Sequence, residues 1–142
     1  MFDIAKSSSE KGVSGQLSRP LLELASDQAY AMLRAFTLRS IVESNKASWP
    51  LDFHMLTNGI SKDTQKEIVD SLPKGSASIR WVPVNLELFR KISLMLSQVS
   101  RMTYARLLIP HVLSNTVSRV SSVDTDVLVL DDLTPLWETD RT

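Results

Sequence analysis

The sequence contains no cysteine, carries no net charge and has no long apolar run, and each of these absences excludes a class of protein. Without cysteine there are no disulfides and no thiolate metal sites, which weakly favours a reducing compartment. The sixteen basic and sixteen acidic residues cancel, so no net field draws the chain to nucleic acid or to an anionic membrane. No apolar run approaches the roughly 20 residues that span a bilayer, and residues 1–6 lack the apolar core of a signal peptide. We therefore expect a cytoplasmic protein without a transmembrane segment.

The composition is that of one globular domain, with 43% hydrophobic and 23% charged residues in a chain of 142. Residues 1–18 place serine and glycine among charges without periodicity, which predicts a flexible leader. Residues 19–142 form the predicted folded part.

Strand and helix patterns alternate along the first half of this folded part. Three apolar runs of strand length are predicted at residues 21–25, 52–56 and 77–82. Between them, helical periodicity predicts helices over residues 30–44 and 61–72, the second with Ser61 as N-cap. This alternation is typical of an α/β fold, a mostly parallel sheet flanked by helices with right-handed crossovers.

The second half carries weaker signals. Residues 86–90 are expected to form a short helical turn, and residues 103–113 a helix that Pro110 kinks or ends. A fourth strand should lead into Asp124, with residues 127–130 continuing extended beyond it. On the helix over residues 30–44 the buried stripe is predicted to consist of Leu33, Phe36, Leu38, Ile41 and Val42.

Asp124-Thr125-Asp126 is the sequence pattern that points most clearly to a binding site. Alternate side chains of an extended backbone point to the same face, so the two carboxylates share one small space. Their repulsion is relieved by protonating one of them or by binding a divalent cation such as Mg²⁺ or Mn²⁺. The alternative is that both aspartates simply end a strand and begin a turn.

A second polar cluster, Asp27 to Tyr30, follows the first strand. In open α/β sheets, ligands bind outside the carboxyl ends of the strands, where connections to the two sides diverge. A carboxylate beside an aromatic ring suits a base, and paired carboxylates with a metal suit a diphosphate. The two clusters together therefore indicate a nucleotide site.

Six segments in order resemble glycosyltransferase family eight, the group of bacterial lipopolysaccharide galactosyl- and glucosyltransferases and of glycogenin. They are residues 27–31, 37–41, 56–61, 100–107, 124–129 and 133–137. The resemblance covers about residues 20–142. It implies a Rossmann-like nucleotide-sugar-binding domain of the glycosyltransferase A type, and retaining, metal-dependent transfer of a hexose from a UDP-hexose donor to a saccharide acceptor. It also allows a peripheral position at the inner membrane.

The resemblance also assigns roles to individual residues. Asp124 and Asp126 would ligate Mn²⁺ or Mg²⁺, and Asp124 would also lie near the ribose. Asp27 and Tyr30 would hold uracil, with Tyr30 stacking on it. The nucleotide-sugar set is completed by Thr125 and by Arg106, whose alternative role is a surface salt bridge.

Three departures from the family pattern shape the expectation. Ala29 stands where the family often has asparagine, and Ser121 and Ser122 replace larger apolar or aromatic residues. Family members continue to a C-terminal acceptor site and a histidine metal ligand, whereas no histidine follows Asp126 here. We therefore expect a C-terminally truncated domain, inactive or incomplete as this fragment and prone to self-association.

Two alternatives remain open at this stage. The chain could be a non-catalytic UDP-binding remnant or one half of a split transferase. The Asp-x-Asp pattern also resembles the nucleophile motif of haloacid dehalogenase-like phosphohydrolases, in which the first aspartate attacks phosphorus.

Overall fold

The computed structural model describes residues 19–87, 101–113 and 115–139, and all statements below concern these residues. The predicted leader and most of the expected turn over residues 86–90 lie outside them. In chain order, the first half forms β1 (Leu21–Asp27), the 3₁₀ helix η1 (Gln28–Tyr30), α1 (Ala31–Ser44), β2 (Leu51–Asn58), α2 (Lys62–Asp70) and β3 (Ala77–Pro83). This part of the predicted order is confirmed.

The described part of the second half is shorter in its elements. It consists of the 3₁₀ helix η3 (Arg101–Leu108), α4 (Ile109–Val112), β4 (Ser121–Ser122) and α5 (Thr134–Glu138). The predicted single helix over residues 103–113 is thus divided. Pro110 lies in the first turn of α4 rather than kinking or ending a helix, because proline lacks the N–H that this position leaves unused.

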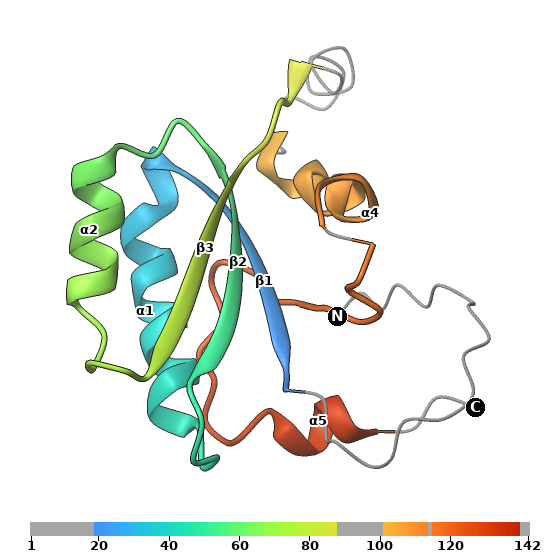
Figure 1. The fold of residues 1–142 in the computed structure, drawn as a ribbon. Helices are drawn as coiled ribbons and strands as arrows, with labels where there is room; N and C mark the ends of the chain where they lie inside the picture. The colour runs from blue at the N-terminus through green and yellow to red at the C-terminus, as the bar shows by residue number, and fades with distance from the viewer. Residues whose placement is uncertain (1–18, 88–100, 114, 140–142) are drawn as a thin grey trace.

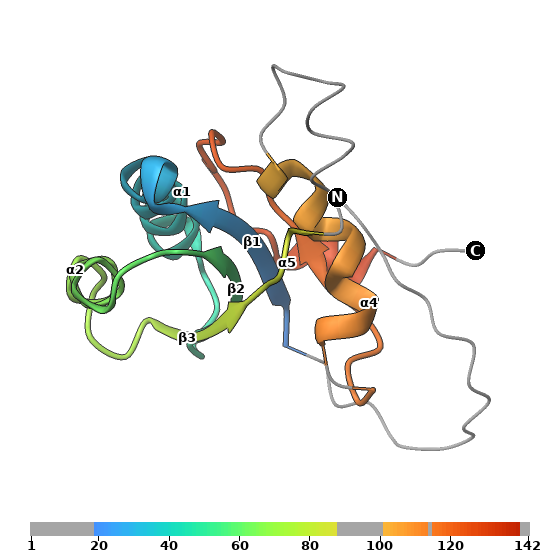
Figure 2. The same cartoon turned by 90° about the horizontal axis from the view of Figure 1, so that it is seen from above.

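The four strands form one parallel sheet in the order β3-β2-β1-β4. Helices α1 and α2 cover one face and η3 with α4 covers the other, as the view from above shows (Figures 1 and 2). Each face has its own apolar cluster, with Leu24, Phe53 and Met55 in the first and Leu56, Ala105 and Ile109 in the second. The result is the predicted three-layer α/β architecture.

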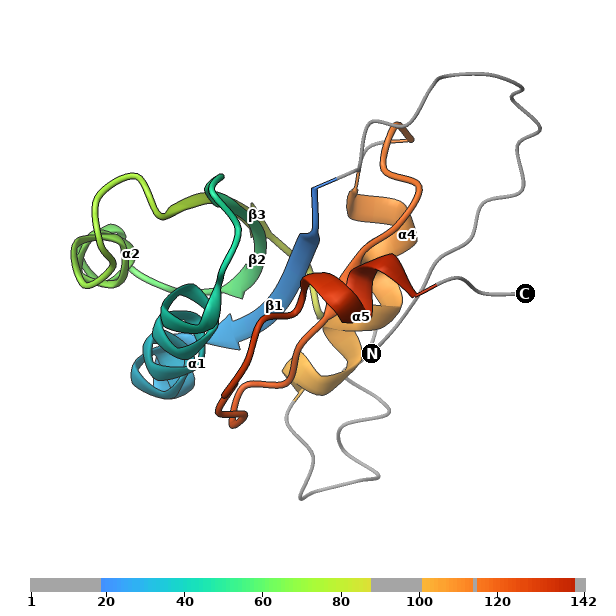
Figure 3. The same cartoon turned by 90° about the horizontal axis from the view of Figure 1, so that it is seen from below.

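The fourth strand is shorter than predicted. Its pairing with β1 is limited to Leu22 with Ser121 and Glu23 with Ser122, and the last sheet bond runs from the Val123 N–H to the Glu23 carbonyl. Residues 127–130 form no strand. They run along α1 instead, between that helix and η3, before α5 begins (Figure 3).

The predicted buried stripe of α1 is partly wrong. Leu38, Ile41 and Val42 are buried, but the side chains of Leu33 and Phe36 are 47% and 67% exposed. The residues buried in their place include three polar ones, Arg34, Thr37 and Ser40. Apolar periodicity missed this face because α1 packs against the backbone of residues 125–129 as well as against the sheet.

No helix in the described ranges is long and apolar enough to cross a membrane.

Candidate functional site

The strand order places a crevice beside β1. The chain leaves β1 toward α1 on one face of the sheet, whereas β4 is reached from η3 and α4 on the other face. Ligands of open α/β sheets bind at such a reversal of strand order, outside the carboxyl ends of the strands. A cavity of about 380 Å³ lies at this position.

All six residues predicted to bind ligand or metal line this one cavity. The described residues around it are Glu23, Ala25, Ser26, Asp27, Tyr30, Arg34, Met102, Thr103, Arg106, Ser122, Val123, Asp124, Thr125 and Asp126. Six of these fourteen residues were predicted from the sequence.

Asp27 and Tyr30 are held by a tight turn at the end of β1. Asp27 is the last residue of the strand and the N-cap of η1, where its Oδ1 accepts a hydrogen bond from the Tyr30 N–H at 3.2 Å. Gln28 ties the turn to the start of α2, because its Nε2 donates to Thr64 Oγ1 and its Oε1 accepts from the Ser61 N–H. Tyr30 keeps 45% of its surface exposed, so its ring is available to a ligand.

The Asp-x-Asp segment is anchored to α1 by hydroxyl groups. Thr37 Oγ1 donates to the Thr125 carbonyl at 2.7 Å, and Ser40 Oγ accepts from the Val129 N–H at 3.0 Å. Ser44 Oγ donates to the Val129 carbonyl at 2.9 Å. These three hydroxyls lie along one side of the helix at i, i+3 and i+7, so they fix the course of the loop after β4.

Arg106 reaches the same segment from the opposite face of the sheet. It lies on η3 and forms an ion pair with Asp124 Oδ1, while the two side chains are 31% and 60% exposed. The alternative role of Arg106, a salt bridge, is thus present in the structure. The salt bridge lies at the cavity where Arg106 was predicted to bind the ligand. Exposed ion pairs contribute little to stability, so a ligand can separate this pair at small cost.

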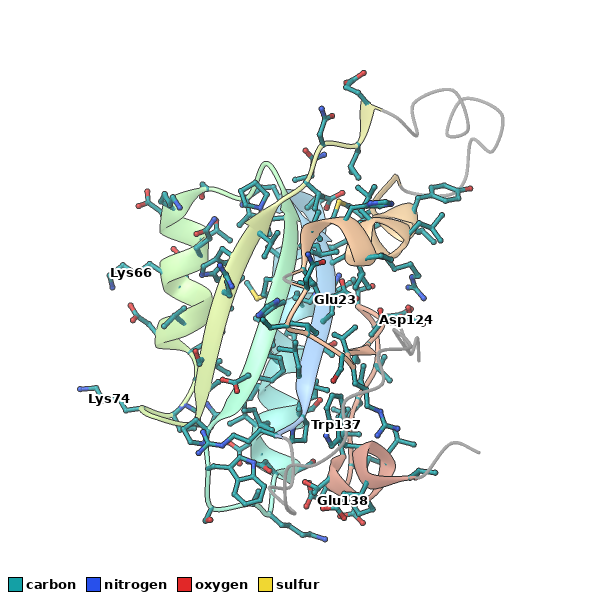
Figure 4. The ribbon with its side chains drawn as sticks, turned by 45° about the vertical axis from the view of Figure 1, so that its right-hand side comes forward. Glu23, Lys66, Lys74, Asp124, Trp137 and Glu138 are labelled. Atoms are coloured by element: carbon teal, nitrogen blue, oxygen red, sulfur yellow. The ribbon has the colours of Figure 1, made fainter. Side chains whose placement is uncertain are left out.

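Two buried charged residues in the cavity were not predicted. Glu23, on β1, and Arg34, on α1, are 1% and 0% exposed. Ser122 Oγ donates to Glu23 Oε2 at 2.6 Å, whereas Glu23 Oε1 and all three guanidinium nitrogens of Arg34 have no hydrogen-bond partner among the described residues. Figure 4 shows Glu23 and Asp124 near each other beside β1.

Burial and neighbouring charges act in opposite directions on these two groups. Burial raises the pKa of the Glu23 carboxyl, while the hydrogen bond from Ser122 and the charges of Arg106 and Arg34 lower it. Burial also lowers the pKa of Arg34 to about 10, and the nearby carboxylates, Glu23 first and Asp124 next, oppose that shift. Arg34 is therefore a buried cation at neutral pH.

The metal-ligating capacity of the cavity comes from Asp124 and Asp126. The described part of the chain contains no group of three or more His, Cys, Asp or Glu side chains placed to hold a metal ion. His54 lines a separate hollow beside Arg80 and Trp81, and His111 is exposed on α4. Trp137 is buried, with the Arg119 guanidinium 5.2 Å from its ring centre, as expected for a packing residue.

Comparison with known proteins identifies the family of this chain. Residues 22–142 match the family described as glycosyl transferase family 8. The chain belongs to glycosyl transferase family 8. Its fold superimposes on the galactosyltransferase LgtC, solved in complex with donor and acceptor sugar analogues, with a TM-score of 0.76 and 33% identity over 84% of this chain. The family assignment and the glycosyltransferase A type of fold are thereby confirmed.

More distant relatives match a similar share of this chain. A probable galacturonosyltransferase-like protein 10 of Arabidopsis thaliana is 27% identical over 79% of this chain, and general stress protein A of Bacillus subtilis is 23% identical over 80%. Mouse xyloside xylosyltransferase 1 shares the fold, with a TM-score of 0.62, at 14% identity.

The matched region is only part of each of these proteins. It spans 31% and 40% of the two curated relatives and 42% of the LgtC chain. The activity of a whole family 8 protein is therefore carried over to this chain only as a proposal.

Proposed function

We propose that the cavity binds a UDP-hexose together with a divalent cation, as the donor site of a retaining hexosyltransferase that acts on a lipopolysaccharide-like saccharide acceptor. One observation carries the proposal: Asp27, Tyr30, Arg106, Asp124 and Asp126, from three separate segments, line a single cavity at the reversal of strand order. Membership of glycosyl transferase family 8 favours this reading of the Asp-x-Asp pattern over a phosphohydrolase nucleophile.

Each residue has a chemical role in this proposal. The exposed Tyr30 ring stacks on uracil, and Asp27, whose Oδ1 caps η1, accepts a hydrogen bond from the base through its other oxygen. Asp124 lies near the ribose. Thr125, anchored through its carbonyl to Thr37, keeps the neighbouring aspartates in place. Arg106 exchanges its contact with Asp124 for oxygens of the donor, which its planar guanidinium suits.

The carboxylates present fit a hard divalent ion that is only partly coordinated by the protein. Asp124 and Asp126 are exposed and line the cavity, and carboxylate oxygens are the ligands that Mg²⁺ prefers. When bound, Mn²⁺ or Mg²⁺ would supply positive charge that stabilises the departing diphosphate. With two protein carboxylates, the ion should bind weakly alone and more tightly when ligand oxygens complete its shell.

The base selectivity of the purified protein tests the donor assignment. Calorimetric titration in the presence of Mn²⁺ should show tighter binding of UDP than of ADP, because the larger purine does not match the spacing of Tyr30 and Asp27. A preference for ADP, or no binding of either nucleotide, would contradict a UDP-sugar site.

A transfer assay separates an enzyme from a binding protein. UDP-galactose or UDP-glucose is incubated with the protein, Mn²⁺ and a panel of saccharide acceptors, and products are examined by mass spectrometry. A new glycosidic bond with the anomeric configuration of the donor supports the retaining transferase. UDP binding without transfer supports the non-catalytic alternative or a requirement for a further part of the protein.

A further inference from the structure

Arg34 is a buried cation whose hydrogen-bonding groups have no partner in the described part of the chain. Its side chain is 0% exposed, and Nε, Nη1 and Nη2 lack partners among the described residues. A buried charge without hydrogen bonds carries a large desolvation penalty. An acceptor that enters from the cavity would remove that penalty, and Arg34 is one of the residues that line it.

The surroundings of Arg34 disfavour an anionic acceptor. The carboxylates of Glu23, Asp124, Asp27 and Asp126 all act on its charge, in that order of strength. Four carboxylates thus already act on one guanidinium, and Arg106 is paired with Asp124. The proposed divalent cation and Arg106 offset the charges of Asp124 and Asp126 where the diphosphate binds, but Glu23 and Asp27 still act on Arg34. A neutral carbonyl oxygen accepts hydrogen bonds there without their repulsion.

The position of Arg34 on α1 indicates which part of the ligand its side chain contacts. Tyr30 directly precedes α1, and Arg34 follows it by four residues. Tyr30 is the N-cap of α1, and both residues line the same cavity. A base stacked on the Tyr30 ring therefore has its edge within reach of the guanidinium.

We propose that Arg34 determines base specificity, by donating hydrogen bonds from its buried guanidinium to a carbonyl oxygen of the uracil base. The proposal rests on the proposed function, since it assumes a uridine nucleotide in the cavity. Glu23 keeps the pocket floor polar: its Oε2 is held by Ser122, and its Oε1 is available to a donor. Cytosine has an amino group in place of the 4-carbonyl, so the guanidinium meets a donor there instead of a carbonyl oxygen.

The experiment measures binding of three probes, UDP, CDP and inorganic pyrophosphate, by calorimetry in the presence of Mn²⁺. Arg34→Met should weaken UDP about ten-fold or more, since hydrogen bonds from a charged group contribute roughly 1.5 to 3 kcal/mol. It should leave pyrophosphate nearly unchanged and reduce the preference for UDP over CDP. Arg39→Met is the matched control, because Arg39 lies on the same helix but pairs with Glu43 and the Ser71 carbonyl at the surface.

Removing one buried charge can also destabilise the fold, because Glu23 then loses a nearby cation. The double variant Glu23→Gln/Arg34→Met leaves neither charge and is expected to melt at or above the temperature of the unmodified chain. It should still bind UDP weakly and pyrophosphate normally. Thermal denaturation of all variants separates a loss of folding from a loss of recognition.

Each outcome bears on a different claim. Equal losses for UDP and pyrophosphate would place Arg34 on the phosphates and overturn the proposal. An unchanged UDP affinity in the double variant would show that water or protein groups satisfy Arg34, which also overturns it. If the unmodified protein binds no UDP at all, the proposed function itself fails.

Discussion

The hydrogen bond between Thr37 and Thr125 should control both the stability of the chain and its nucleotide affinity. Thr37 is 2% exposed, and its Oγ1 lies 2.7 Å from the Thr125 carbonyl oxygen. Thr37→Val keeps the shape and the β-branching but removes the hydroxyl. The Thr125 carbonyl, between the two aspartates, then loses its only donor among the described residues.

The expected cost follows from leaving that carbonyl without a partner. A buried acceptor left unsatisfied costs about 1 to 3 kcal/mol, and the half-buried Thr125 places this loop toward the lower end. A loss of about 1 kcal/mol lowers the Tm of a domain near this size by roughly 2 to 4 °C. Because the loop positions Asp124 and Asp126, UDP affinity in Mn²⁺ should fall as well.

Thermal denaturation followed by circular dichroism, together with UDP calorimetry, tests this prediction. Ser44→Ala is the comparison, since Ser44 anchors the same loop at Val129, beyond the aspartates. It should lower the Tm with less effect on UDP. An unchanged Tm for Thr37→Val would refute the anchoring contact, and a lowered Tm with full UDP affinity would refute its role in binding.

Two further predictions address the base and the buried carboxyl. Tyr30→Ala should weaken UDP binding about ten-fold or more, because stacking contributes about 1 to 3 kcal/mol per base. Equal UDP affinity of the variant and the unmodified protein in calorimetry would show that the base does not stack on Tyr30. Burial raises the pKa of Glu23 from its ordinary 4.5, while Ser122, Arg106, Arg34 and Asp124 face the same carboxyl. The folded state therefore holds the Glu23 proton more tightly than the unfolded chain, and stability is lost as pH rises from 4.5 through the raised pKa. Urea titrations across this window should show the loss in the unmodified chain and a smaller one in Glu23→Gln; parallel curves would contradict it.

The first three strands and six of the fourteen residues that line the cavity could be predicted from the sequence, because their signals are local. Strands β1 to β3 are short segments rich in apolar residues. Ser61 has the expected N-cap geometry, its hydroxyl accepting from the Thr64 N–H. The rule that ligands lie at the carboxyl ends of strands then placed Asp27 and Asp124 in one cavity.

What the sequence could not show depends on contacts between distant segments. The buried face of α1 is set by residues 125–129, which bond to Thr37, Ser40 and Ser44, so apolar periodicity pointed to the wrong side at Leu33 and Phe36. The fourth strand ends early for the same reason, because the chain turns toward α1 after Val123.

Arg34 and Glu23 were missed because charged residues in predicted core elements look like surface positions. Two signals were present: Glu23 interrupts the apolar run Leu21-Leu22-Glu23-Leu24, and Arg34 follows Tyr30 by one helical turn. Both become informative only when β4 and residues 124–126 are placed beside β1.

The most direct test of the central claim is the coupling between metal, nucleotide and the paired aspartates. UDP is titrated by calorimetry with and without Mn²⁺ into the protein and into its Asp126→Ala variant. Mn²⁺ should strengthen UDP binding to the unmodified protein and have little effect on the variant. Equal UDP affinity in all four combinations would contradict a metal-assisted nucleotide-sugar site at Asp124 and Asp126.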